Sequence, residues 1–143
     1  MTAESTIPLN SPEAISRGLG AKNVAIVGLS SNPDSPSYHV AAYLKEHGYH
    51  IIPVNPREES VLGEAAYPSL REVPEKIDVV DVFRRPDAVP EVVEQAIEMG
   101  APVLWLQLGI VNDEAAEQAR AAGITVVMDR CMKIEHGLRH MLL

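Results

Sequence analysis

The hydrophobic positions of this chain gather into five short runs, and each run predicts a strand. Three of them are Val24–Gly28, Ile51–Val54 and Val79–Phe83, and two more lie within APVLWLQ and ITVVMD. The runs are nearly continuous in Val, Ile and Leu. This pattern is typical of strands that are covered on both faces, as in a parallel sheet.

Between these runs the hydrophobic spacing changes to that of helices. In PDAVPEVVEQAIEMG the apolar residues recur on one helical face, and Asp87 is the expected N-cap. Asn112 is expected to cap the helix in VNDEAAEQARAAG, and Ser11 a leading helix with Pro12 in its first turn. A short stripe of Val and Ala follows the first strand, Ser69–Glu72 predicts a brief helix or turn, and MKIEHGLRHMLL predicts a final helix.

Three glycines mark where helical patterns end. Gly48, Gly100 and Gly123 each separate a helical pattern from the apolar run that follows it. A glycine at such a place commonly adopts the left-handed conformation that terminates a helix. We therefore expect positive φ angles at all three positions.

Strands that alternate with helices predict an α/β fold. We expect a Rossmann-like, doubly wound, five-stranded and mainly parallel sheet with helices on both faces, forming one domain over residues 1–143 with its core at 24–136. In such a sheet a ligand binds outside the carboxyl ends of the strands, where the strand order reverses. The candidate functional residues are therefore those that directly follow each strand.

Charge and composition narrow the choice of partners. The net charge of -8 and a pI near 5.0 argue against nucleic acid, because phosphate backbones require a basic face. The single cysteine, Cys131, fits a reducing compartment. We find neither a secretory signal pattern nor an apolar run of the ~18 residues that a membrane span requires. We therefore expect a cytoplasmic protein that does not engage a membrane.

The loop after the first strand, GLSSNPDSPSY, offers groups that suit a phosphate. Gly28 permits a tight turn, and Ser30, Ser31 and Asn32 place small polar side chains beside backbone N–H groups at a helix start. A dinucleotide fingerprint has a second glycine two residues after the first, and here that position is Ser30. An ordinary loop whose serines merely cap the helix explains the same residues equally well.

The residues at the end of the second strand indicate which nucleotide ligand the site suits. An NAD site has an acidic residue at this strand tip, where it accepts the ribose hydroxyls. Here the strand ends in Pro53-Val54-Asn55-Pro56-Arg57, and Glu58 and Glu59 come only later. Arg57 is instead a cation suited to a phosphate on the ribose, which leaves NADP and coenzyme A. A solvated loop arginine is the alternative for Arg57 alone.

Polar and charged residues also follow the third and fourth strands. Arg84 and Arg85 either meet a pyrophosphate or pair with an acid such as Asp81 or Asp87. In the fourth segment, Gln107 can bond a ligand amide or the neighbouring loop, and Gly109 allows close approach to the backbone. Trp105 is expected to lie in the core.

Four segments form one recognisable set when they are taken in order: VAIVGLSSNPDSPSYHVAAYLKEHGYHIIPVNPR, LGEAAYPSLREVPEKIDVVDVFRRPD, LWLQLGIVNDEAA and VVMDRCMKIEH. They cover roughly Val24 to His136. The set resembles the small stand-alone CoA-binding proteins, whose Rossmann-like domain is similar to the N-terminal domain of the succinyl-CoA synthetase alpha subunit.

The resemblance implies that coenzyme A or an acyl-CoA lies with its adenosine diphosphate part over the glycine turn. The implied binding residues are Gly28, Ser30 and Ser31 at the diphosphate, with Asn32 in the same loop; Asn55, Pro56 and Arg57 beside the adenosine and its ribose phosphate; Val82, Phe83 and Arg84 beneath the ligand; and Gln107, Leu108 and Gly109 facing the pantetheine arm.

The resemblance does not supply a reaction. A complete synthetase of this type needs a second domain with a phosphorylated histidine and an ATP-binding partner, and 143 residues leave room for neither. We therefore expect a non-catalytic CoA-binding or regulatory module that acts alone, as a homodimer or with an unknown protein partner. An NADP-binding oxidoreductase or sensor, and a CoA-ligase component that needs a partner chain, are the alternatives.

The remaining chemistry-bearing residues predict no catalytic or metal centre. His136 and His140 are four apart and can share a helix face that binds a metal weakly, but we expect both to be solvated. Cys131 follows the last strand, and Arg130 beside it favours a thiolate that can form a mixed disulfide with the CoA thiol. A buried, inert cysteine is the favoured interpretation. The serines crowd one loop, and nothing selects a histidine to serve them as a base.

Overall fold

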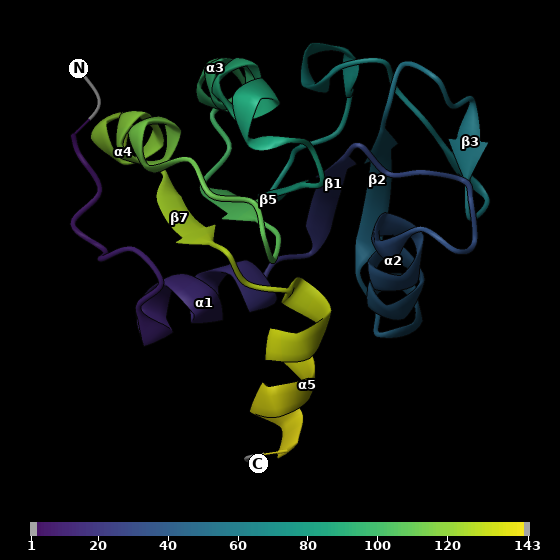
Figure 1. Ribbon diagram of the computed structural model, residues 1–143, viewed down its shortest axis with the longest axis horizontal. Coiled ribbons are helices and arrows are strands. Elements are labelled where there is room, and N and C mark those ends of the chain that lie inside the picture. Colours follow the sequence, from purple (N-terminus) through teal and green to yellow (C-terminus); the bar gives the residue numbers. More distant parts are fainter. Residues whose placement is uncertain (1–2, 142–143) are drawn as a thin grey trace.

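A five-stranded sheet forms the centre of the computed structural model, which describes residues 3–141 (Figure 1). Its strands are β1 (Asn23–Val27), β2 (His50–Val54), β5 (Val79–Val82), β6 (Val103–Leu106) and β7 (Thr125–Met128). They lie in the order β2-β1-β5-β6-β7, and every neighbouring pair is parallel. The predicted Rossmann-like α/β fold is confirmed.

Helices cover both faces of this sheet (Figure 1). On one face lie α1 (Pro12–Leu19), α2 (Pro36–Glu46) and α5 (Met132–Met141), packed on a core that includes the predicted core residue Trp105. On the other face lie α3 (Val89–Met99) and α4 (Asp113–Ala121), with a second aliphatic core beneath them. Short 3₁₀ turns precede β5 and α3, at Leu70–Glu72 and Pro86–Ala88.

Two of the three predicted helix caps are confirmed. The Ser11 side chain accepts a hydrogen bond from the amide of Ala14, and the Asn112 side chain accepts one from Ala115. The prediction for Asp87 is wrong, because the turn at Pro86–Ala88 runs directly into α3 and places Ala88 at the cap position. Proline fixes φ near its helical value, so the chain begins to turn before the aspartate can act as a cap.

The predicted glycine terminators are also confirmed. Gly48, Gly100 and Gly123 have φ angles of 91°, 68° and 92°. Each lets the chain leave a helix in the left-handed conformation and enter the next strand.

A small hairpin between β2 and β5 was not predicted. Its strands are β3 (Ser60–Val61) and β4 (Glu64–Ala65), joined at Leu62 and Gly63 with φ angles of 55° and 80°. Two positive φ angles make the tight turn that suits a two-residue hairpin. Leucine rarely adopts such a conformation, so the letters VLGE do not indicate this turn.

The strand order reverses at β1, and this creates the crevice that a doubly wound sheet offers to ligands. The chain runs from β1 to β2 on one side and later to β5 on the other. Gly28 and Phe83, the last residues of two predicted strands, lie just beyond β1 and β5. A Cβ atom on Gly28 would overlap the carbonyl oxygen of Phe83, and φ at Gly28 is 88°. Glycine therefore permits the close approach of the two chain segments here.

The longest helices, α2 and α3, have 11 residues. Within residues 3–141, no helix combines the length and the apolar character that crossing a membrane would take.

Candidate functional site

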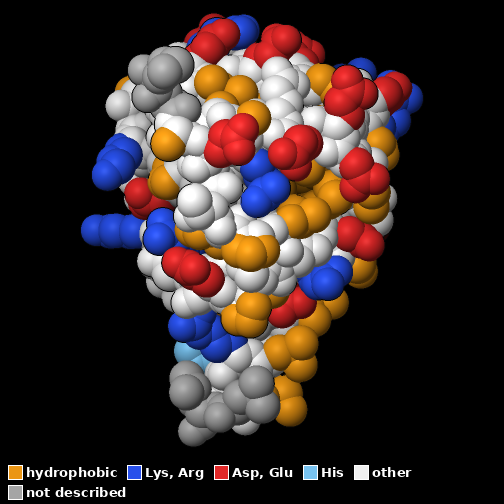
Figure 2. Space-filling model, turned by 90° about the vertical axis from the view of Figure 1, so that its left-hand side faces the viewer, with side chains coloured by type: hydrophobic (Ala, Val, Ile, Leu, Met, Phe, Trp, Pro, Cys, Tyr) orange, Lys and Arg blue, Asp and Glu red, His pale blue; other side chains and the backbone are white. Residues whose placement is uncertain are grey.

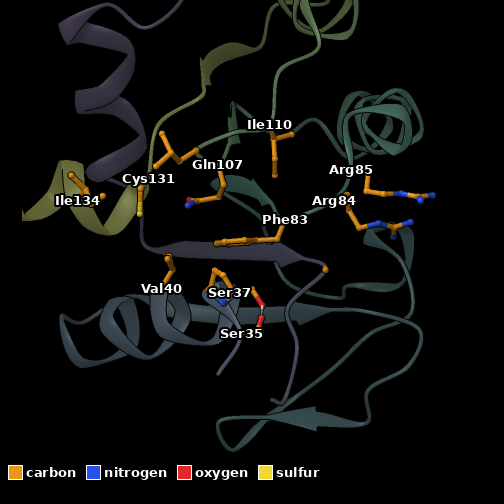
Figure 3. A pocket seen from close by; sticks show the side chains of 13 residues that line it. Ser35, Ser37, Val40, Phe83, Arg84, Arg85, Gln107, Ile110, Cys131 and Ile134 are labelled. Atoms are coloured by element: carbon orange, nitrogen blue, oxygen red, sulfur yellow. Dashed lines mark hydrogen bonds between the residues drawn. The ribbon is translucent and has the colours of Figure 1, made fainter. Parts of the chain in front are cut away.

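A cavity of about 630 Å³ lies at the reversal point, outside the carboxyl ends of β1, β5 and β6 (Figure 3). Gly28, Phe83 and Gln107 contribute from the loops that follow these three strands. The first turn of α2 and the start of α5 also line the cavity (Figure 3). The remaining lining residues are Ser35, Pro36, Ser37, Val40, Arg84, Arg85, Leu108, Ile110, Cys131 and Ile134.

The two ends of the cavity differ in chemistry. Figure 3 places the guanidinium groups of Arg84 and Arg85 on one side, and Cys131 and Ile134 on the opposite side. Phe83 lies between them, across the middle of the cavity. Arg85 is 3.5 Å from the carboxylate of Asp87, whereas Arg84 has no ion-pair partner among the described residues. A long ligand with an anionic end and an apolar or thiol end matches this polarity.

Cys131 and Gln107 are positioned by the loop that leads into α5. Gln107 is buried, and its side-chain oxygen accepts a hydrogen bond from the amide of Met132 at 3.2 Å. Gln107 thus bonds the neighbouring segment, one of the two roles considered from the sequence. Cys131 is half-buried and lines the cavity, so the expectation of a buried cysteine is wrong.

The first loop is held by its own side chains. The amide of Ser30 donates to the Ser37 hydroxyl at 3.0 Å, and the amide of Asn32 donates to the Ser30 hydroxyl at 3.1 Å. Ser30, Ser31 and Asn32 do not line the large cavity; Ser35 and Ser37 do. Ser35 and Ser37 belong to the loop that was expected to hold a ligand but were not among its named candidates, although Pro36 between them marks the start of α2 and could have indicated them.

An acidic side chain also reaches the first loop. The Glu58 carboxylate accepts a hydrogen bond from the amide of Ser31 at 2.6 Å. Asn55 joins the same two loops, because its side-chain amide donates to the carbonyl of Leu29 at 3.0 Å. In the sequence, Glu58 is only an acid that lies too far beyond the strand tip for an NAD site, and no local pattern indicates this contact.

Arg57 lies at the outer end of the second loop. Its backbone amide donates to the Asn55 side chain at 3.0 Å, and its side chain is exposed. Among residues 3–141, no carboxylate lies within ion-pair distance of its guanidinium. Arg57 is therefore a cation that an anionic ligand can reach.

A second, smaller cavity of about 230 Å³ borders the same sheet edge near Pro56 and α3. Arg84 lines both cavities. Gln95 lines the smaller cavity, and its side-chain oxygen accepts a hydrogen bond from the amide of Leu70 at 3.1 Å. The two cavities are therefore neighbours at the carboxyl edge, with Arg84 bordering each of them.

Three further candidate residues lie in different surroundings. Val82 is fully buried in the core beneath α3 and α4. Leu108 is 62% exposed at the rim of the large cavity. Gly109 has a φ of 85°, and its amide donates to the Asp129 carboxylate at 2.7 Å.

Asp81 is not the ion-pair partner that the sequence suggested for Arg84 or Arg85. It is fully buried between Ile26 and Trp105 in the sheet, and neither carboxylate oxygen has a hydrogen-bond partner among the described residues. Burial raises the pKa of this carboxyl well above its usual range, so its neutral form is favoured.

The sequence predicted that His136 and His140 are both solvated, and this is wrong for His136. His136 is buried, and its Nδ1 lies 2.7 Å from the Tyr43 hydroxyl. Burial first, and then the nearby His140, His47 and Arg139, lower the pKa of His136. Within the described part of the chain, no group of three or more His, Cys, Asp or Glu side chains is arranged to hold a metal ion.

The sequence of this chain is similar to a known family and to known proteins. A family model described as "CoA binding domain" matches residues 22–137. The uncharacterized protein YneT of Bacillus subtilis (strain 168) is 45% identical over 118 residues, which cover 82% of this chain and 87% of YneT.

A solved structure and an enzyme subunit extend the comparison. A hypothetical protein from Pyrococcus horikoshii OT3 superposes with a TM-score of 0.86 at 44% identity, over 94% of this chain and 97% of that one. The alpha subunit of acetate–CoA ligase (ADP-forming) II from Pyrococcus furiosus is 34% identical over 124 residues, which cover 79% of this chain but 27% of that subunit.

Proposed function

The chain belongs to the family of CoA-binding domains, and from this premise we propose that it binds coenzyme A or an acyl-CoA at the carboxyl edge of its sheet. In this proposal the chain is a binding or regulatory module without a reaction of its own. The observation that carries the proposal is the cavity at the point of strand reversal, within the segment that the family match covers.

The chemistry of the cavity supports coenzyme A over a smaller nucleotide. Coenzyme A has phosphates at one end and a thiol at the other, joined by a pantetheine arm in which short hydrocarbon segments alternate with two amides. The cavity has arginines at one end and Cys131 at the other, with Phe83 between them (Figure 3). Its volume of about 630 Å³ lies in the ordinary range of small-molecule sites.

The proposed ligand lies along the edge of the sheet. Its pantetheine arm crosses Phe83 and ends near Cys131, and its diphosphate lies at Gly28 and the first loop. Arg84 faces the phosphates, since it borders both cavities. The adenosine lies toward Pro56, which lines the smaller cavity. The exposed side chain of Arg57, the next residue, is proposed to meet the ribose phosphate. The chain is acidic as a whole, and in this proposal the arginines supply positive charge beside the phosphates of the ligand.

A second candidate function is a component of a CoA ligase. The similarity to an acetate–CoA ligase alpha subunit favours it, although this chain spans about a quarter of that subunit's length. In this alternative a separate chain supplies nucleotide chemistry, and this chain holds the thiol substrate. CoA binding by the isolated chain is common to both functions, and only the ligase component consumes CoA when a partner chain is added.

A ligand series tests the proposal. Thermal unfolding of the chain is compared with coenzyme A, acetyl-CoA, NADP and NAD at equal concentrations. A ligand at ~100 times its dissociation constant adds about 2.7 kcal/mol to the free energy of unfolding. We expect stabilisation by coenzyme A and none by NAD. Equal shifts with all four ligands would remove the preference on which the proposal depends.

Arg57 gives a sharper test within the same series. Arg57→Ala is expected to weaken coenzyme A binding by about 1.5–3 kcal/mol, the value of a charge-assisted hydrogen bond. Dephospho-CoA lacks the ribose phosphate, so its affinity should be nearly unchanged. Calorimetric titration of both ligands measures the difference. Equal losses for the two ligands would exclude Arg57 from contact with that phosphate.

A further inference from the structure

A cluster of aromatic and histidine rings joins α2 to α5 away from the cavity. Tyr43 of α2 and His47, the C-cap of that helix, are stacked with their ring centroids 4.0 Å apart. His136 of α5 packs edge-on against both, at 5.4 Å from Tyr43 and 5.1 Å from His47. The Tyr43 hydroxyl lies 2.7 Å from Nδ1 of His136. This contact fixes the orientation of the His136 ring.

His140 follows His136 by one helical turn in α5. The Nε2 atoms of the two rings are 3.0 Å apart, the distance of a hydrogen bond between them. Two imidazole nitrogens bound to one metal ion at about 2.0–2.1 Å each lie about 3 Å apart, so one ion can take the place of the shared proton. Imidazole nitrogens suit Cu²⁺ and Ni²⁺, which favour tetragonal coordination.

We propose that His136 and His140 form a two-histidine site for a divalent transition metal of tetragonal preference, Cu²⁺ or Ni²⁺. The two Nε2 atoms are the protein ligands, and water completes the coordination. His140 is exposed at the end of the molecule that α5 forms, which gives the ion access from solvent. Figure 2 shows a histidine side chain on the surface at this narrow end.

The contact with Tyr43 suits His136 as a metal ligand. The Tyr43 hydroxyl can accept a hydrogen bond from Nδ1–H, which leaves the lone pair of Nε2 for the metal. Partners of this kind orient metal-binding histidines in many proteins.

Positively charged side chains near His136 and His140 weaken the binding of a metal ion. Arg139 lies close enough to His136 for its positive charge to act on that ring, and the same charge repels a bound cation. Lys133 lies over the Tyr43 ring, 5.6 Å from its centroid. With two protein ligands and these cations nearby, we expect an affinity below that of closed structural sites with four ligands.

Metal titration of histidine variants tests the site. The untagged full chain is titrated calorimetrically with CuCl₂ and with NiCl₂ at neutral pH, and the Cu²⁺ complex is examined by electron paramagnetic resonance. We expect one ion per chain and coupling to two imidazole nitrogens. His140→Ala should weaken binding about tenfold or more, and Tyr43→Phe by a similar factor through the loss of its hydrogen bond.

Two control variants separate this site from other histidines and from loss of fold. His39→Ala removes an exposed histidine on α2 and should leave metal affinity unchanged. His140→Ala should keep the circular dichroism spectrum of the parent, since His140 is exposed on the last turn of α5. Unchanged affinity in His140→Ala, or an equal loss in His39→Ala, would overturn the proposal.

Discussion

Glu58 occupies one of the backbone amides that a phosphate at the first loop would use. Its carboxylate accepts the hydrogen bond of the Ser31 amide at 2.6 Å, as a phosphate oxygen would. An anionic ligand that reaches this amide must first displace the carboxylate. Glu58 therefore competes with the proposed ligand as well as tying the two loops together.

Replacing the charge of Glu58 tests this competition. Glu58→Gln keeps the shape of the side chain but removes the charge that repels a diphosphate. We expect it to strengthen coenzyme A binding by about 0.5–1.5 kcal/mol, the net value of one hydrogen bond. Calorimetric titration gives the affinity, with Glu59→Gln as the matched neighbouring control. Weaker binding in Glu58→Gln would mean that Glu58 supports the loops more than it blocks them.

At the level of residues, the sequence predicts which segments meet but not which atoms are free. Gly28, Phe83, Arg84, Gln107 and Leu108 were expected at the edge, and all five line the large cavity. Side chains that satisfy the loop amides come from positions 7 and 27 residues away, as in the Ser30–Ser37 and Ser31–Glu58 contacts. No local spacing rule identifies such pairs, so they become visible only in the folded chain.

Helices and strands were predicted more reliably, because their signals are local. The glycine terminators and the caps at Ser11 and Asn112 depend on neighbours within a few residues. The cap at Asp87 failed because Pro86 had already started a 3₁₀ turn. The β3–β4 hairpin was missed because its turn places Leu62 at a positive φ.

Asn112, which caps α4, and Asp87, which does not cap α3, are expected to differ in their contribution to stability. Asn112→Ala removes the cap of α4 and the bond from the Asn112 side chain to the carbonyl of Pro86, and should cost about 1–2 kcal/mol of unfolding free energy. Asp87→Ala removes an exposed side chain that caps nothing, and should change stability by less than about 0.5 kcal/mol. Urea unfolding of both variants measures the contrast. Similar losses would restore Asp87 as a cap.

The whole molecule carries a buried acid in its central strand, and this affects stability over pH. In the unfolded chain Asp81 titrates near the ordinary aspartate pKa of about 3.9, and in the fold its pKa is raised well above that by burial. Between the two values the folded state holds a proton that the unfolded state has lost. The protonated Asp81 makes its full contribution to the free energy of unfolding below the pKa of the unfolded chain. This contribution is lost as the pH rises toward the higher pKa of the folded state.

Asp81→Asn tests this linkage, since asparagine is neutral at every pH. The variant should match the parent protein near pH ~4 and exceed it at neutral pH. The difference should grow by at most about 1.4 kcal/mol per pH unit. Urea unfolding across this pH range gives the result. A difference that stays constant with pH would mean that Asp81 is charged in the folded state.

On the scale of the whole molecule, the polarity of the carboxyl edge connects the fold to the proposed function. Figure 2 shows acidic side chains spread over one face of the molecule, in keeping with the net charge of -8. The large cavity nevertheless has two arginines at one end. The parallel sheet brings these arginines and Cys131 to the same edge, because every strand ends there.

A crystal structure of the chain grown with coenzyme A tests whether the ligand lies along the carboxyl edge of the sheet. We expect continuous ligand density along this edge, with the pantetheine arm over Phe83 and the phosphates between Gly28 and the guanidinium of Arg84. Coenzyme A bound at another surface, with this cavity holding only solvent, would contradict this expectation.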